Sequence, residues 1–153
     1  MLFRSPVTGK IDHIQVNDEK KTIEIFDFKT GTYHKEKWGS VSSLYRYSLQ
    51  LGFYKLILEA SPRYKNYKVT KGHILFVRPD DEGKVYDKEL DFDEFERKEE
   101  PKLKAMMAAV YHQATTLEFL DDEELRIEPD KKRSFKEVKE FIALLLEKSG
   151  KIG

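Results

Sequence analysis

The start of the chain carries two segments that alternate between polar and apolar residues. Residues 9–16 (GKIDHIQV) and 22–29 (TIEIFDFK) are rich in β-branched residues, so both are predicted to be strands. The polar stretch 17–21 (NDEKK) between them is typical of a turn. The sequence therefore predicts a β-hairpin.

The apolar residues of this hairpin fix its register. With residues 18–21 as the loop, three pairs face each other on one side of the sheet: Val16 with Ile23, Ile14 with Ile25, and Asp12 with Asp27. A slip of one residue would break the apolar match, which supports this register.

The acidic end of the hairpin is the feature that needs explaining. Directly opposed residues lie roughly 5 Å apart at Cβ, and like charges there destabilise the pair. Lys29 follows Asp27 by two positions, so its side chain leaves the same face. We interpret Asp12, Asp27 and Lys29 as a metal-dependent catalytic site. The alternative is a surface hairpin whose acids pair with Lys10 and Lys29.

The remaining segments predict a mixed α/β fold, a small central sheet flanked by helices. The expected order is a loop at 30–39, a helix from serines 40, 42 and 43 to about 60, strands at 69–77 and 84–90, a short helix around 92–95, a helix at 101–119, and a helix opened by a capping box at 134–137. We expect one domain over residues 1–153.

Composition limits the function. The formal net charge is zero, whereas a free-standing nucleic-acid binder is more often basic. The chain has no cysteine, which excludes disulfides and cysteine-ligated iron–sulfur clusters and is compatible with the cytoplasm. No apolar run approaches the length of a membrane span, so no membrane partner is expected.

The helix after the hairpin carries a mixed polar stripe. Tyr47, Gln50, Leu51 and Tyr54 are spaced i, i+3, i+4 and i+7, so they share one side of the helix. Near the acidic end of the hairpin, Gln50 and Tyr54 could bind a substrate or a metal-bound water. The alternatives are a surface amide for Gln50 and a half-buried core tyrosine for Tyr54.

These segments resemble the RecB-like branch of the PD-(D/E)xK nuclease superfamily. Residues 9–13 (GKIDH), 27–31 (DFKTG) and 50–54 (QLGFY) are similar to three of its sequence elements, in the family's order, and 110–119 is similar to its closing helix. One such element alone is a weak signal, whereas three in order are a strong one.

The resemblance implies a restriction-endonuclease-like core and hydrolysis of DNA, as by an exonuclease of recombination or repair. The residues implied to be catalytic are Asp12, Asp27, Lys29, Gln50 and Tyr54. Mg²⁺ or Mn²⁺ would be bound by Asp12, Asp27 and the Phe28 carbonyl. DNA is the implied partner, with helicase or recombination-complex subunits as further ones.

Two departures from the family pattern open an alternative. His13 stands where the family has arginine, and strand alternation points it away from Asp12. The family's upstream helix with a His or Glu has no counterpart in residues 1–8, as expected for a domain truncated at its N-terminus. The alternative is an inactive nuclease-like domain that binds DNA or braces a larger helicase-nuclease; a third option is an interaction module without nucleic acid.

The other polar signals are given structural interpretations. His34, His73 and His112 lack metal-ligand spacing, and Trp38 is expected to anchor a loop. The acidic stretch 87–100 is expected to lie away from DNA, and the basic run 131–133 to be a solvated surface.

Overall fold

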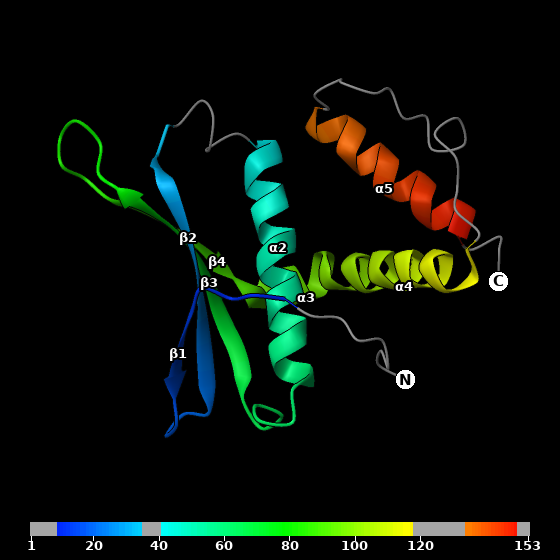
Figure 1. Ribbon diagram of the computed structural model, residues 1–153, viewed down its shortest axis with the longest axis horizontal. Coiled ribbons are helices and arrows are strands. Elements are labelled where there is room, and N and C mark those ends of the chain that lie inside the picture. Colours follow the sequence, from blue (N-terminus) through cyan, green and yellow to red (C-terminus); the bar gives the residue numbers. More distant parts are fainter. Residues whose placement is uncertain (1–8, 35–40, 118–133, 150–153) are drawn as a thin grey trace. The chain divides into compact units, whose positions relative to one another are not determined.

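The computed structural model describes residues 9–34, 41–117 and 134–149 (Figure 1). The chain groups into two compact units, residues 1–100 and 101–153, which are treated separately below. The single domain expected over 1–153 stays a prediction.

The first unit is built on a four-stranded sheet. The strands are β1 (His13–Asn17), β2 (Thr22–Thr32), β3 (Lys68–Arg78) and β4 (Tyr86–Asp91), in the order β1-β2-β3-β4. β1–β2 and β3–β4 are antiparallel pairs, whereas β2–β3 is parallel. A parallel pair needs a crossover connection, and helix α2 (Val41–Ala60) supplies it. The predicted mixed α/β class and both hairpins are confirmed.

The register of the first hairpin is the predicted one. Val16 pairs with Ile23 and Ile14 with Ile25. Along β2, Ile23, Ile25 and Asp27 are buried, and the residues between them are partly exposed. This alternation turns every second side chain of β2 into the core.

The ladder starts later than predicted, at His13 rather than at residue 9. Asp12 therefore lies just before the ladder and does not form a strand pair with Asp27. Its Oδ2 instead accepts a hydrogen bond from the Phe28 N–H at 2.9 Å. The side chain thus competes with the regular backbone ladder, as short acidic side chains often do.

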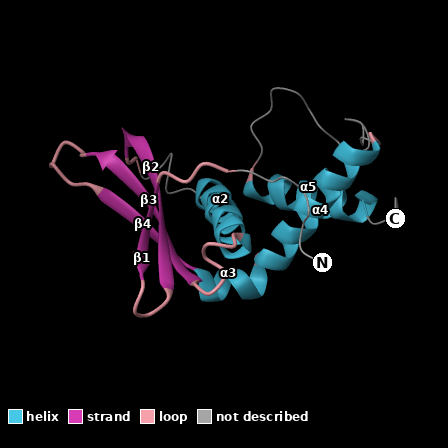
Figure 2. Ribbon diagram, turned by 60° about the horizontal axis from the view of Figure 1, so that its bottom comes forward, coloured by secondary structure: helices cyan, strands magenta, loops and turns pink. Residues whose placement is uncertain are grey.

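Helices α2 and α3 (Phe92–Lys98) pack on one face of the sheet (Figure 2). Two glycines allow the close approach. A Cβ on Gly72 of β3 would lie 2.8 Å from Leu51 Cδ1, and a Cβ on Gly52 of α2 would lie 2.1 Å from Phe95 Cζ. The largest fully buried side chains are those of Phe76, Phe92, Ile23, Ile25, Leu51 and Val69. Backbone-to-side-chain packing at these glycines therefore fixes α2 against β3 and α3.

Other boundaries differ from the expected ones. β2 continues to Thr32, where a loop was predicted, because its end pairs with Arg78 of β3. β4 runs over Tyr86–Asp91 rather than 84–90. α2 begins at Val41, so serines 42 and 43 lie inside the helix instead of capping it. Ser40 lies outside the described residues.

The second unit contains helix α5 (Phe135–Ser149) and nearly all of α4 (Glu100–Thr116). The predicted capping box is confirmed: the Ser134 N–H donates to Glu137 Oε2 at 2.7 Å, and the Glu137 N–H donates to Ser134 Oγ at 3.3 Å. Residues 118–119, Trp38 and the run 131–133 lie outside the described residues. Within the described parts of the chain, no helix has the length and apolar character needed to span a membrane.

Candidate active site

The candidate site lies where β2 faces α2, and Asp27 is at its centre. Asp27 is only 5% exposed because strand alternation turns it toward the core. Lys29 leaves the same face, and its Nζ lies 2.6 Å from Asp27 Oδ2. This ion pair does not have hydrogen-bond geometry, so the buried Oδ2 accepts no hydrogen bond. A buried carboxylate oxygen is thus directed at a cation.

Gln50 of α2 joins the site residues together. Its Nε2 donates to Asp27 Oδ1 at 2.8 Å and to the Tyr54 hydroxyl at 2.9 Å. Its Oε1 accepts from Lys29 Nζ at 3.4 Å. A carboxylate can only accept, so the amide nitrogen must face Asp27 and the oxygen must face Lys29. Gln50 is therefore not a free surface amide. It belongs to a polar cluster around Asp27, whose other members are Lys29 and Tyr54.

Tyr47 also reaches the cluster, although its place in the helical stripe was all that the sequence analysis predicted for it. Lys29 Nζ lies 5.1 Å from the centre of the Tyr47 ring. Burial raises the pKa of Tyr47, the Arg46 charge opposes this effect, and the Asp27 charge adds to it. The available signal was the i, i+3 spacing from Gln50, which places both side chains on one stripe.

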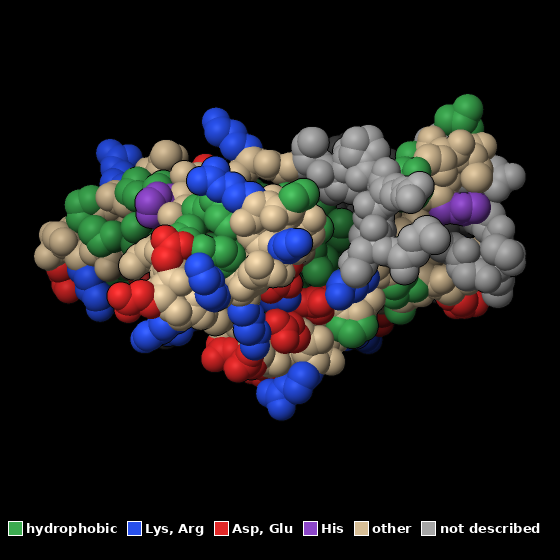
Figure 3. Space-filling view, turned by 90° about the horizontal axis from the view of Figure 1, so that it is seen from below, with side chains coloured by type: hydrophobic (Ala, Val, Ile, Leu, Met, Phe, Trp, Pro, Cys, Tyr) green, Lys and Arg blue, Asp and Glu red, His purple; other side chains and the backbone are tan. Residues whose placement is uncertain are grey.

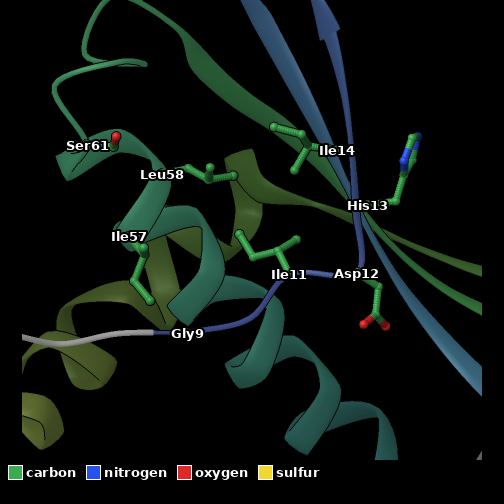
Figure 4. Close-up of a pocket in the computed structure, with 8 residues that line it drawn as sticks. All are labelled: Gly9, Ile11, Asp12, His13, Ile14, Ile57, Leu58 and Ser61. Carbon is green, nitrogen blue, oxygen red and sulfur yellow. The ribbon is translucent and has the colours of Figure 1, made fainter.

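Asp12 occupies the edge of the same region. Its side chain is exposed and holds the N–H of the peptide that links Asp27 to Phe28. Next to it is a pocket of about 460 Å³ (Figure 4) lined by Gly9, Ile11, Asp12, His13, Ile14, Ile57, Leu58 and Ser61. In the close-up, Asp12 and His13 point in different directions, as strand alternation predicts. Asp12 thus fixes the backbone directly after Asp27, at the Phe28 N–H.

The donor set fits a hard divalent cation with few protein ligands. Among the described residues, no group of three or more His, Cys, Asp or Glu could hold a metal ion. Two carboxylates, of Asp12 and Asp27, and the Phe28 carbonyl are present. Mg²⁺ commonly binds through one or two carboxylates and keeps several waters, so ligands of this chemistry would suit it. The buried Asp27 Oδ2, which faces the Lys29 ammonium without accepting a hydrogen bond, is the observation that favours a cation here.

The opposite face of the sheet carries a separate set of polar residues. His73 is stacked on Phe26 with ring centres 4.5 Å apart, and its Nδ1 lies 2.8 Å from Asp87 Oδ2. Glu89 pairs with Lys71 at 2.9 Å. The β4 acids Asp87 and Glu89 therefore lie on the face away from Asp27. That the whole acidic stretch lies away from DNA stays a prediction. His73 is buried, at 7% exposed, as predicted for a core histidine.

Charge on the surface is mixed. Over the face seen in Figure 3, basic and acidic side chains are interspersed, with no extended basic tract among the described residues. This agrees with the formal net charge of zero.

A family model described as the PD-(D/E)XK nuclease superfamily matches residues 3–135, which includes every residue of the cluster. Neither the curated proteins nor the solved structures contain a significant match.

Proposed function

The chain belongs to the PD-(D/E)XK nuclease superfamily, and from this premise we propose that it hydrolyses DNA phosphodiester bonds with Mg²⁺ or Mn²⁺. The mixed sheet with its helices is consistent with the restriction-endonuclease-like fold of that superfamily. The observation that carries the proposal is the buried Asp27 carboxylate, with one oxygen free of hydrogen bonds and a lysine ammonium 2.6 Å away.

In this proposal the carboxylates of Asp12 and Asp27 and the carbonyl of Phe28 hold the metal ion. A bound divalent ion would lower the pKa of a water molecule and neutralise charge on the phosphate. The hydrogen bond from the Phe28 N–H to Asp12 orders the backbone on which the carbonyl sits. A fixed backbone lowers the cost of ordering the site when a ligand binds.

The side chains around Asp27 have complementary roles. The Lys29 ammonium stabilises negative charge that develops on the phosphate oxygens during attack. Gln50 forms hydrogen bonds with both Asp27 and Lys29, so it fixes the distance between the carboxylate and the ammonium. Tyr54 accepts a hydrogen bond from the Gln50 amide and thereby fixes its orientation.

The finer assignment is RecB-like: an exonuclease of DNA recombination or repair that works in the cytoplasm, alone or with helicase or recombination-complex subunits. It is supported by the order of the segments 9–13, 27–31 and 50–54. The contacts of Gln50 with Asp27 and Tyr54 add support, because they join residues of two of these segments.

The test is degradation of linear DNA by the purified protein with Mg²⁺ or Mn²⁺. Asp27→Asn and Lys29→Met are expected to lower the rate about 100- to 1000-fold, the range found for the loss of one charge-stabilising group. Lys71→Met is the matched control, since Lys71 is also a strand lysine paired with an acid but lies on the other face. If Asp27→Asn cleaves as fast as the unaltered protein, the catalytic assignment is wrong.

The second candidate is an inactive nuclease-like domain that binds DNA or supports a larger helicase-nuclease. It is favoured by the small number of acidic ligands, because the described residues offer no group of three. Calorimetric titration with Mn²⁺ separates the two candidates. Binding that is lost in Asp12→Asn and Asp27→Asn supports the enzyme, whereas no binding together with retained DNA association supports the inactive domain.

A further inference from the structure

The Lys29 ammonium is held from more than one direction, and the third contact is an aromatic ring. Its Nζ lies 2.6 Å from Asp27 Oδ2, 3.4 Å from Gln50 Oε1 and 5.1 Å from the centre of the Tyr47 ring. A cation within about 6 Å of a ring centre is attracted by the electron-rich face.

The two polar contacts of the ammonium differ in strength. The approach to Asp27 is close but lacks hydrogen-bond geometry, and the hydrogen bond to Gln50 is long. The Lys29 side chain is 25% exposed and has a flexible four-carbon stem, so water competes for its charge. A third contact would narrow the orientations open to the ammonium.

The Tyr47 ring is itself well placed to supply that contact. It lies one helical turn before Gln50, so the ring and the amide are presented by the same helix. Leu51, which follows Gln50, is 1% exposed and would lie 2.8 Å from a Cβ built on Gly72. This tight packing fixes the height of α2 above the sheet, and with it the position of the ring over Lys29.

We propose that Tyr47 is a positioning residue, whose ring holds the Lys29 ammonium at the candidate site in the orientation needed for phosphodiester hydrolysis. The proposal rests on the proposed function and adds a residue to it. The contact with the ring does not use the charge of Asp27. It therefore persists when Asp27 binds another cation, and it prevents Lys29 from turning into solvent at that moment.

In this proposal the ring of Tyr47, rather than its hydroxyl, positions Lys29. The test therefore compares a variant without the ring and a variant without the hydroxyl. Tyr47→Leu removes the ring and is expected to lower kcat roughly five- to thirtyfold, the range that corresponds to a partly desolvated cation–ring contact. KM for DNA is expected to change less than about twofold, because the ground-state contacts of DNA remain. Tyr47→Phe keeps the ring and is expected to have the kcat of the unaltered protein.

A matched control exists at the other end of α2. Tyr64 also lies beneath a cation, with Arg63 Cζ 5.2 Å from its ring centre, and it follows the last turn of the helix. Tyr64→Leu removes an equivalent contact away from the cluster and is expected to leave kcat unchanged. A loss of activity in both leucine variants would assign the effect to helix stability and overturn the proposal.

Nuclear magnetic resonance tests the positioning without any cleavage. In protein labelled at lysine Cε, the Lys29 Hε protons, identified by their loss in Lys29→Arg, are expected upfield because they lie over an aromatic ring. The shift is expected to remain in Tyr47→Phe and to vanish in Tyr47→Leu. Lys29 protons at ordinary lysine positions in the unaltered protein would overturn the proposal, whichever variants fold.

The two measurements separate this inference from the proposed function. Upfield Lys29 protons in a protein that cleaves no DNA would leave the ring contact intact and reject the nuclease. Normal cleavage by Tyr47→Leu would reject the role of Tyr47 and leave the nuclease intact.

Discussion

Two lysines of the first unit meet carboxylates in different ways. Lys55 of α2 is 3% exposed and lies within ion-pair distance of three glutamates: Glu59 at 2.8 Å, Glu96 at 3.1 Å and Glu100 at 2.9 Å. Lys29 of β2 is 25% exposed and pairs with one aspartate. Lys55 thus has three carboxylate partners, whereas Lys29 has one.

This difference separates a structural network from a site. Burial by itself lowers the pKa of Lys55, and its three glutamates outweigh that effect and raise it. Glu59 also accepts from the Val69 N–H, so the network ties α2 to β3. At Asp27, by contrast, a buried oxygen has no hydrogen bond. A carboxylate paired with one partly exposed cation can exchange that cation for a ligand, whereas a completed network only stabilises the fold.

The largest expected effect is on the Lys55 network. Lys55→Met leaves three glutamates close together without their cation, so it should lower the free energy of unfolding by about 3–5 kcal/mol. Urea denaturation measures this change. Lys68→Met is the control, because Lys68 forms an exposed pair with Asp93 and its loss should cost at most about 1 kcal/mol. Equal effects of the two variants would contradict the comparison.

A smaller loss is expected where α2 meets α3. Gly52→Ala places a Cβ 2.1 Å from Phe95 Cζ, so the helices must separate, at a cost of about 1–3 kcal/mol. Gly31→Ala is matched to it, since a Cβ there meets nothing within 4 Å. Urea denaturation of both should show a loss for Gly52→Ala alone.

A hydrogen bond of Tyr45, also in α2, makes the stability of the fold depend on pH. Its hydroxyl donates to Glu99 Oε2 at 3.1 Å, and Tyr45→Phe should cost about 1 kcal/mol at pH 7. Burial, followed by the charge of Glu99, raises the pKa of Tyr45 from 10.0 to about 12. The folded state thus prefers the neutral phenol, and this contribution is complete below pH 10 and is lost as pH rises toward 12.

The stability difference between the unaltered protein and Tyr45→Phe should therefore shrink between pH 10 and 12. Chemical denaturation at pH 8, 10 and 11.5 measures it, and subtraction removes the effects of other groups. A difference that grows with pH would reject the assignment.

The smallest change in stability is expected at the site itself. Asp27→Asn should alter the free energy of unfolding by less than about 1 kcal/mol, because losing a buried charge offsets losing its single pair. The Lys29 ammonium can turn into solvent, since it is already partly exposed. Cleavage and stability are thus expected to respond in opposite ways in Asp27→Asn and Lys55→Met.

The sequence predicted what depends on local periodicity. Alternation fixed the hairpin register, and helical spacing placed Gln50 and Tyr54 together. It did not predict the Lys55 network, because Glu96 and Glu100 are distant in the chain and no local pattern links them to Lys55. It also placed Asp12 in the ladder, since alternation does not reveal that a side chain will bind the Phe28 N–H.

The end of β2 was missed for a related reason. Thr30-Gly31-Thr32 is a weak strand sequence, and glycine there suggests a break. Pairing of Thr32 with Arg78 of β3 overrides this preference. Tertiary partners, which a local pattern cannot supply, decided both the strand end and the lysine network.

The cluster around Asp27 is drawn almost wholly from one strand and the helix that follows it. Asp27 and Lys29 come from β2, and Tyr47, Gln50 and Tyr54 come from α2. Asp12 comes from the residues just before β1, and it reaches the backbone rather than the acid. A transfer of residues 22–60 to another protein of this fold would therefore carry these polar contacts together, whatever the sequence of the rest of the domain.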